Sequence, residues 1–176
     1  GAGTPVGHVR TLACAGYAGP AEAARAYLDA LAAELGAAFE APRAAAWAVA
    51  TAVTQDRVAL TNSGWSFSRE AAQRGLGLQR LQLLNDFEAL ALALPHLQPT
   101  QLRAVGRTPE PAPGGVLAVV GPGTGLGVAS IVPHAGRWVA LPGEGGHATL
   151  APGDEAESAV LAAARREHPH VSAERL

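Results

Sequence analysis

The sequence of 176 residues contains one cysteine, no methionine and no lysine. A single cysteine excludes a disulfide within the chain and a cysteine-based zinc site. Cys14 ends the segment 8–14, whose apolar residues predict a strand, so we expect a buried thiol rather than a nucleophile. This cysteine usage favours a reducing compartment, and we therefore expect a cytoplasmic protein.

Clustered positive charges and long apolar runs are also absent. The formal net charge is −2 and no basic patch is visible, so neither nucleic acid nor an anionic membrane is an expected partner. Residues 1–8 lack the cationic start and apolar core of a signal peptide, and no stretch is apolar enough to cross a bilayer. Because the chain lacks methionine and starts in a loop-like segment, we expect it to be truncated at both ends.

The chain does have enough apolar residues for a packed core, 48% against 16% charged residues. Its most informative stretch begins with the run 80–84, which predicts a buried strand, and continues with 87–94, which predicts a helix ending at Pro95. Asn85 and Asp86 are therefore expected at a strand-to-helix corner, on the carboxyl edge of a parallel sheet, where open α/β sheets bind ligands. From this stretch alone, capping of the helix is the simpler role for Asp86.

The remaining pattern is typical of a mixed α/β fold. Strands are predicted at 8–14, 44–53 (buried on both faces), 57–61 and 116–120, with a hairpin of 128–132 and 137–141. Helices are predicted at 21–39, at 69–74 with Ser68 as its cap, and at 154–167. Three prolines and two glycines in 108–115 predict a domain boundary. We expect a small domain over 1–108, a linker over 109–115 and the beginning of a larger domain over 116–176.

A glycine-rich loop, 121–127, follows the strand predicted at 116–120. Glycines allow backbone N–H groups to close around an anion, and the Thr124 hydroxyl adds a further donor, so the loop is suited to a polyphosphate. It matches neither a Walker loop nor a dinucleotide-binding fingerprint. A tight hairpin turn would use the same glycines, and the loop alone does not decide between the two.

The loop 143–147 places glycines on both sides of Glu144 and ends at His147. A carboxylate and an imidazole three residues apart provide hydrogen-bond acceptors and a donor, which fits a ligand with many hydroxyl groups. A zinc site with two ligands and no cysteine is a poor alternative. A solvent-exposed turn with an incidental histidine is as good an interpretation when this loop is considered alone.

Five motifs occur in a fixed order along the chain. The motifs are Leu60-Thr61-Asn62 with Trp65-Ser66-Phe67-Ser68, Leu84-Asn85-Asp86-Phe87, the loop 121–127, Leu141-Pro142-Gly143-Glu144-Gly145-Gly146-His147, and His170-Val171-Ser172-Ala173-Glu174-Arg175. In the first of them, Trp65 and Phe67 are expected to hold a loop against the core. Taken together and in order, the five motifs resemble the bacterial ATP-dependent glucokinases of the hexokinase/actin-like ATPase superfamily, and the resemblance extends from about His8 to the last residue.

The resemblance implies a role for each matching residue. Asp86 would be the general base for the sugar 6-hydroxyl, and Asn62 would lie near the sugar. Glucose would be bound by Asn85, Asp86, Glu144, His147 and Glu174, and a phosphate-binding loop would be formed by Gly121, Gly123, Thr124, Gly125 and Gly127. It also implies an incomplete ribonuclease H-like/actin-like fold, ATP with Mg²⁺ as cofactor without a metal site in this chain, and a homodimeric parent protein.

The chain lacks the family's first phosphate loop, Asp-x-Gly-Gly-Thr, and the part that would bind adenosine. The parent protein is therefore expected to be a glucokinase, while this segment alone is expected to be inactive. Two alternatives remain: a sugar-binding fragment without catalysis and a kinase for another hexose. A sugar-responsive regulator lacks support because no helix-turn-helix or basic face is visible.

Overall fold

The computed structural model describes residues 6–60, 63–106, 112, 114–123 and 125–176. It divides into two compact units, Gly1–Asp86 and Phe87–Leu176, which we describe separately. Mixed α/β structure is present in both, as the sequence predicts. Within the described ranges, no helix combines the length and the apolar character needed to cross a membrane.

The first unit is built around a pair of parallel strands. Strand β1 (Ala44–Val49) pairs with β4 (Arg80–Asn85), and the register runs from Ala44 opposite Arg80 to Val49 opposite Asn85. A short antiparallel pair adds β2 (Arg57–Ala59) and β3 (Ser66–Ser68). The helices are α1 (Pro20–Leu35), which starts with proline at its first position, and α2 (Arg69–Gly75).

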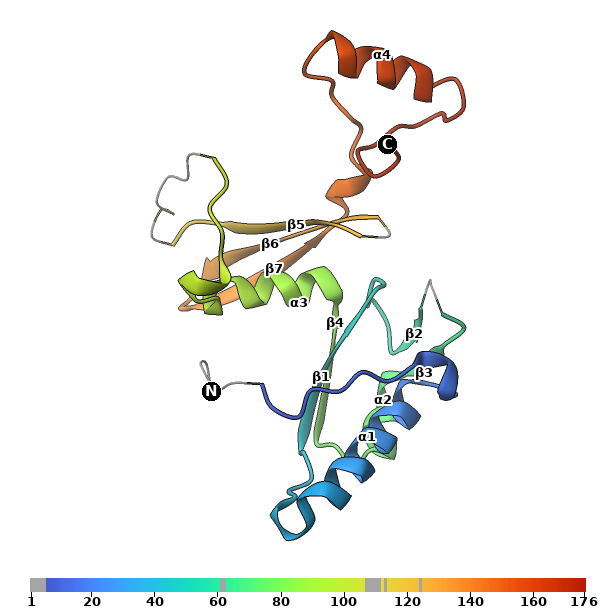
Figure 1. The fold of residues 1–176 in the computed structure, drawn as a ribbon, viewed down its shortest axis with the longest axis vertical. Helices are drawn as coiled ribbons and strands as arrows, with labels where there is room; N and C mark the ends of the chain where they lie inside the picture. The colour runs from blue at the N-terminus through green and yellow to red at the C-terminus, as the bar shows by residue number, and fades with distance from the viewer. Residues whose placement is uncertain (1–5, 61–62, 107–111, 113, 124) are drawn as a thin grey trace. The chain divides into compact units, whose positions relative to one another are not determined.

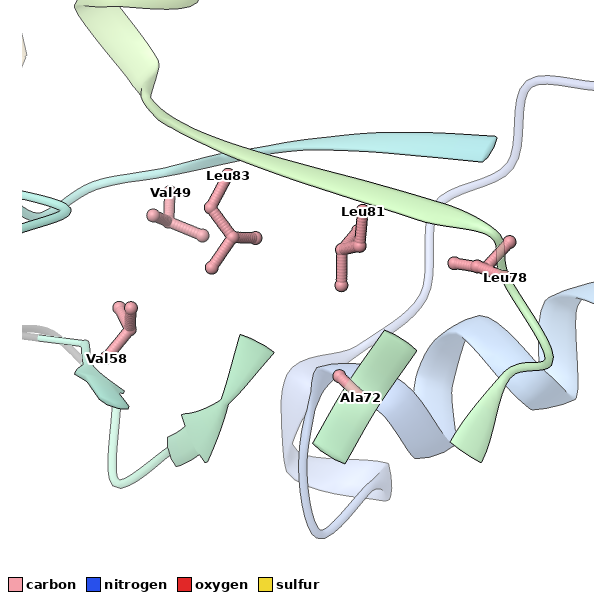
Figure 2. Close-up of a cluster of buried hydrophobic side chains, with 6 residues drawn as sticks. All are labelled: Val49, Val58, Ala72, Leu78, Leu81 and Leu83. Carbon is pink, nitrogen blue, oxygen red and sulfur yellow. The ribbon is translucent and has the colours of Figure 1, made fainter. Parts of the chain in front are cut away.

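The core of this unit lies where alternate residues of β1 and β4 point to one side. Leu81 and Leu83 are buried while Arg80 and Gln82 are exposed, as the two-residue period of a strand requires. Figure 2 shows Val49, Leu81 and Leu83 directed from the parallel pair toward Val58 and Ala72. Trp47 and Phe67 extend the cluster with an edge-to-face contact, their ring centroids 5.8 Å apart. The expected contact of Phe67 with the core is thereby confirmed.

The second unit combines an antiparallel sheet with α3 (Asp86–Ala93), whose first residue belongs to the first unit (Figure 1). The sheet has the order β5 (Leu117–Pro122), β6 (Leu126–His134) and β7 (Arg137–Gly143). Ala91 of the helix and Ala129 and Ile131 of β6 form its buried core. Helix α4 (Glu155–Ala164) follows, and the short 3₁₀ segments of the chain are Cys14–Gly16, Gly36–Ala38, Leu94–His96, Pro99–Gln101 and Gly145–His147.

Several predicted elements are confirmed with shifted ends. The strand-to-helix corner, the parallel pairing and the hairpin of β6 and β7 are present. Helix α1 ends at Leu35 rather than 39, because Gly36 takes a positive φ of 54° and a 3₁₀ turn follows. The predicted strand 57–61 shortens to Arg57–Ala59, and α4 is capped by Asp154, which accepts from the Glu157 N–H at 2.8 Å.

Two predictions about strands are wrong. Residues 8–13 form no strand, because no strand of the described residues pairs with them, and Val9 is 79% exposed. Cys14 begins a 3₁₀ turn and is exposed rather than buried. Strand β1 ends at Val49 instead of 53, and its residues alternate between exposed and partly buried, so it is not covered on both faces.

The compact units do not divide at the proline-rich segment. The division lies between Asp86 and Phe87, because α3 packs on the β5–β7 sheet through Phe87, Leu92 and Leu94. Residues 87–106, which the sequence assigned to the small domain, lie in the second compact unit of this structure. The domains of the longer protein, 1–108 and 116–176 with a linker at 109–115, stay a prediction.

Two side chains satisfy N–H groups at the start of α2. The Ser68 hydroxyl accepts from the Ala71 N–H at 3.1 Å, which confirms the predicted cap, and Asp56 accepts from the Glu70 N–H at 2.9 Å. Two hydrogen bonds to the carboxylate lower the pKa of Asp56 below its ordinary value. The bond from the Ser68 hydroxyl has the larger effect, and the bond from the Glu70 N–H has the smaller one.

The lowered pKa of Asp56 predicts a specific dependence of stability on pH. Because this pKa is depressed in the folded state, the stability that Asp56 contributes is present above about pH 4 and is lost as the pH falls through the folded pKa. Asp56→Asn should flatten this part of the acid dependence, as measured by urea unfolding between about pH 2.5 and 7. A carboxyl-carbon NMR titration that places the Asp56 pKa at or above about 4 would contradict the account.

The core in Figure 2 predicts a large cost for truncating Leu83. Leu83 is 5% exposed, and Leu83→Ala should lower the free energy of unfolding by about 2–5 kcal/mol. Leu102 is 60% exposed, and Leu102→Ala is the matched control, with an expected change within about 0.5 kcal/mol. Urea unfolding measures both, and equal losses would show that the assigned core is wrong.

Candidate active site

The corner between β4 and α3 holds the first pair of candidate residues. Asn85 is the last residue of β4 and Asp86 the first of α3, and both are partly buried. The Asn85 amide donates to the carbonyl of Thr51, just beyond β1, at 3.4 Å. Asn85 therefore lies where the carboxyl ends of two parallel strands meet, as the sequence predicts. Asn62, the other candidate in this unit, lies outside the described residues.

The predicted phosphate loop is the tip of the β5–β6 hairpin. Its outer glycines, Gly121 and Gly127, are cross-strand partners within the ladder, and only 123–125 lies between the strands. The structure shows the hairpin, and phosphate binding by this loop stays a prediction. Thr124, a predicted phosphate ligand, lies outside the described residues.

Protein atoms already engage two amides of this turn. The Gly123 N–H donates to the Gly125 carbonyl at 2.7 Å, and the Leu126 N–H donates to Glu174 Oε2 at 2.9 Å. A side chain at residue 125 would have its Cβ 2.6 Å from the same carboxylate oxygen, so a glycine there leaves room for Glu174. The glycine at this position thus has an explanation in packing, beside the one in phosphate binding.

Three of the predicted sugar ligands lie together in the second unit. His147 Nε2 is 3.7 Å from Glu144 Oε2 and 3.7 Å from Glu174 Oε1. The side chains of Glu144 and His147 are 79% and 60% exposed, whereas that of Glu174 is 29% exposed. Two carboxylates and an imidazole thus offer acceptors and a donor to one small polar ligand.

The local fold explains why these residues meet. Gly145–His147 forms a 3₁₀ turn after β7, and Gly146 lies so close to the Leu126 carbonyl that no Cβ fits. The Gly146 carbonyl accepts from the Glu174 N–H at 3.3 Å. These contacts hold the turn and Glu174 against the tip of the β5–β6 hairpin.

A second set of contacts joins the two ends of the segment 149–172, which contains α4. Thr149 forms a bridge with Ser172, and the Leu150 N–H donates to the Val171 carbonyl at 3.0 Å. The Thr149 hydroxyl lies 3.1 Å from His170 Nε2, and Val171 and Ser172 are buried. We call these five residues (Thr149, Leu150, His170, Val171 and Ser172) the neck. The neck brings Glu174 back to His147 across the sequence.

Sequence reasoning missed the Leu126 N–H, Thr149 and the contact of Phe87 with the hairpin. The signal for this region was the motif from His170 to Arg175, which carries part of the family resemblance. Among the described residues, no group of three or more His, Cys, Asp or Glu side chains is arranged to hold a metal ion.

Comparison with known proteins adds to this geometry. The model of the glucokinase family matches residues 2–176. The chain belongs to the glucokinase family. A glucokinase of Paramagnetospirillum magneticum is 48% identical over 166 residues, which cover 94% of this chain and 50% of that protein. The chain thus spans about half the length of such curated glucokinase relatives.

Solved glucokinase structures resemble the fold. The crystal structure of glucokinase from an Antarctic psychrotroph gives a TM-score of 0.75 at 35% identity, covering 91% of this chain and 48% of that one. Glucokinase from Balamuthia mandrillaris in complex with glucose gives 0.53 at 19% identity, covering 86% and 48%. The second likeness concerns the fold alone.

The neck predicts that one hydroxyl group stabilises the position of Glu174. Thr149→Val removes the contact with His170 while keeping the shape of the side chain. Because the pair is exposed, we expect hydrogen exchange at the Leu150 and Glu174 amides to accelerate only about two- to threefold. Exchange is measured by NMR, and Thr149→Ser, which keeps the hydroxyl, is the control. Equal exchange rates in the two variants would refute this role of the hydroxyl.

Proposed function

We propose that the whole protein is an ATP-dependent glucokinase, which transfers the γ-phosphoryl group of ATP to the 6-hydroxyl of glucose. The observation that supports this most is the grouping of Glu174 with the neighbouring residues Glu144 and His147, in a chain of the glucokinase family. The relatives are about twice as long as this chain, so the proposal concerns the whole protein.

Glucose is bound, in this proposal, by Asn85, Glu144, His147 and Glu174, with Asn62 near the sugar. One oxygen of Glu174 accepts from the Leu126 N–H, so the carboxylate is oriented before the sugar arrives. The other oxygen and His147 Nε2, 3.7 Å apart, are within reach of one sugar hydroxyl. A sugar that lacks this hydroxyl leaves both groups unpaired, which is the basis of selectivity.

Asp86 is the proposed general base. Its position supports the assignment, because it directly follows Asn85 at the carboxyl end of β4 and opens α3. A carboxylate in the first turn of a helix also interacts favourably with the helix dipole, so stabilising the helix and serving as a base are compatible. In the reaction Asp86 accepts the proton of the 6-hydroxyl as this oxygen bonds to phosphorus.

ATP with Mg²⁺ supplies the phosphoryl group and the charge neutralisation when bound. The proposed phosphate loop is Gly121, Gly123, Thr124, Gly125 and Gly127. In the observed conformation the N–H groups of Gly123 and Leu126 are bound to protein acceptors, so they do not form an open anion site. We therefore assign no step to this loop.

The remaining proposals concern the whole protein. Its architecture is of the ribonuclease H-like/actin-like type, supported by the likeness to solved glucokinases. It acts in the cytoplasm as a homodimer that binds glucose and ATP and neither nucleic acid nor a membrane, and the isolated chain described here is inactive.

Replacing the proposed base tests the function. In the full-length protein, Asp86→Asn should lower kcat for glucose by at least about a hundredfold, because the neutral amide cannot serve as the base that accepts the proton. Activity is measured by coupling ADP release to NADH oxidation, with glucose, mannose and N-acetylglucosamine as substrates.

Asp29→Asn is the matched control, since Asp29 is an exposed carboxylate of α1. It should keep the activity of the unsubstituted protein, and circular dichroism should show that both variants are folded. Turnover by Asp86→Asn at the level of Asp29→Asn would remove Asp86 from the mechanism. If the unsubstituted protein phosphorylates another of these sugars faster than glucose, that sugar is the substrate and the assignment of glucose is wrong.

A further inference from the structure

The residue after the proposed base fills a space left by two glycines. Gly121 of β5 and Gly127 of β6 face each other across the ladder. A Cβ built on Gly121 would lie 2.9 Å from Phe87 Cζ, and one built on Gly127 would overlap three ring atoms of Phe87. The ring of Phe87 thus occupies the position of both missing side chains.

These glycines are needed for room rather than for backbone freedom. Neither has the positive φ that favours glycine, unlike Gly136 in the β6–β7 turn with a φ of 73°. A glycine within a strand weakens it and often marks a close approach by another group. Here the approaching group is an aromatic ring, and phosphate binding is not required to explain either glycine.

Both sides of this contact are neighbours in sequence of groups that the proposed active site uses. The Leu126 N–H, beside Gly127, holds the carboxylate of Glu174, and Phe87 follows Asp86 in the first turn of α3. The helix continues across the sheet, with Ala91 packed against Ala129 and Ile131. A shift of the Phe87 ring would therefore change the direction in which the first turn of α3 presents Asp86.

We propose that Phe87, in contact with Gly121 and Gly127, is a positioning residue that orients the Asp86 carboxylate for proton transfer. The inference rests on the proposed function. The inference is based on the shape of this contact. The planar ring of Phe87 fits only where two facing positions of the ladder have no side chains. Phe87 does not touch the substrate and acts only through the first turn of α3.

A size-exchange experiment on the full-length protein tests this inference. Gly127→Ala should push the ring away and lower kcat by about tenfold to a hundredfold, because small displacements of a catalytic group are costly. The KM for glucose should change less than threefold. Adding Phe87→Leu to Gly127→Ala gives the new methyl group room and should restore kcat at least threefold over Gly127→Ala alone.

Two further variants keep the experiment decisive. Gly75→Ala is the control, since nothing lies within 4 Å of a Cβ at this end of α2, and it should leave kcat unchanged. If Gly127→Ala does not fold, Gly121→Ala replaces it, because a Cβ there meets only the edge of the ring. Thermal unfolding of each variant separates loss of fold from loss of kcat.

The outcomes distinguish this inference from the proposed function. An unsubstituted protein that does not phosphorylate glucose overturns the proposed function, and the inference with it. An active protein whose kcat survives Gly127→Ala overturns the inference alone. So does a kcat that falls in Gly127→Ala and is not regained when Phe87→Leu is added, because the loss then has a cause other than the crowded ring.

Discussion

The hydrogen bond from the Leu126 N–H to the Glu174 carboxylate is the contact on which the polar cluster of the second unit depends. It joins the tip of the β5–β6 hairpin to the end of the chain, at a distance of 2.9 Å. Without it, the carboxylate would lose the N–H donor that holds Oε2 and so keeps Oε1 3.7 Å from His147. Gly125 and Gly146 are part of the same constraint, because side chains there would collide with Glu174 and with the Leu126 carbonyl.

Glycines in this unit therefore have a role in packing. Gly121 and Gly127 accommodate Phe87, Gly125 accommodates Glu174, and Gly123 alone among the four has nothing within 4 Å of a Cβ. A glycine-rich motif that suggests a phosphate loop can thus reflect the close approach of protein groups. The two explanations are compatible where a ligand replaces an internal acceptor, as a phosphate would have to do at the Gly123 and Leu126 amides.

Local patterns in the sequence predicted those parts of the fold that local interactions determine. The corner at Asn85 and Asp86 was predictable because an apolar strand ends there and a run of helix formers begins. The Ser68 cap followed from the side chain's ability to accept from the Ala71 N–H. Glu144 and His147 could be recognised as a pair because only two glycines separate them in the sequence.

Contacts between distant residues were not predictable in this way. Nothing near Phe87 in the sequence shows that its ring lies over two glycines of the β5–β6 ladder, and nothing near Cys14 shows that its segment lacks a partner strand. The domain boundary was placed by prolines, whereas packing of α3 on the sheet determines the division of the compact units. Grouping Glu174 with His147 required the resemblance to a family, because the neck joins them only in three dimensions.

A crystal structure of the full-length protein with glucose bound tests the central claim most directly. The account predicts sugar hydroxyls on Glu144, His147 and Glu174, with Glu174 still accepting from the Leu126 N–H and the 6-hydroxyl within hydrogen-bond distance of Asp86. Glucose bound away from these residues, or with its 6-hydroxyl out of reach of Asp86, would contradict it.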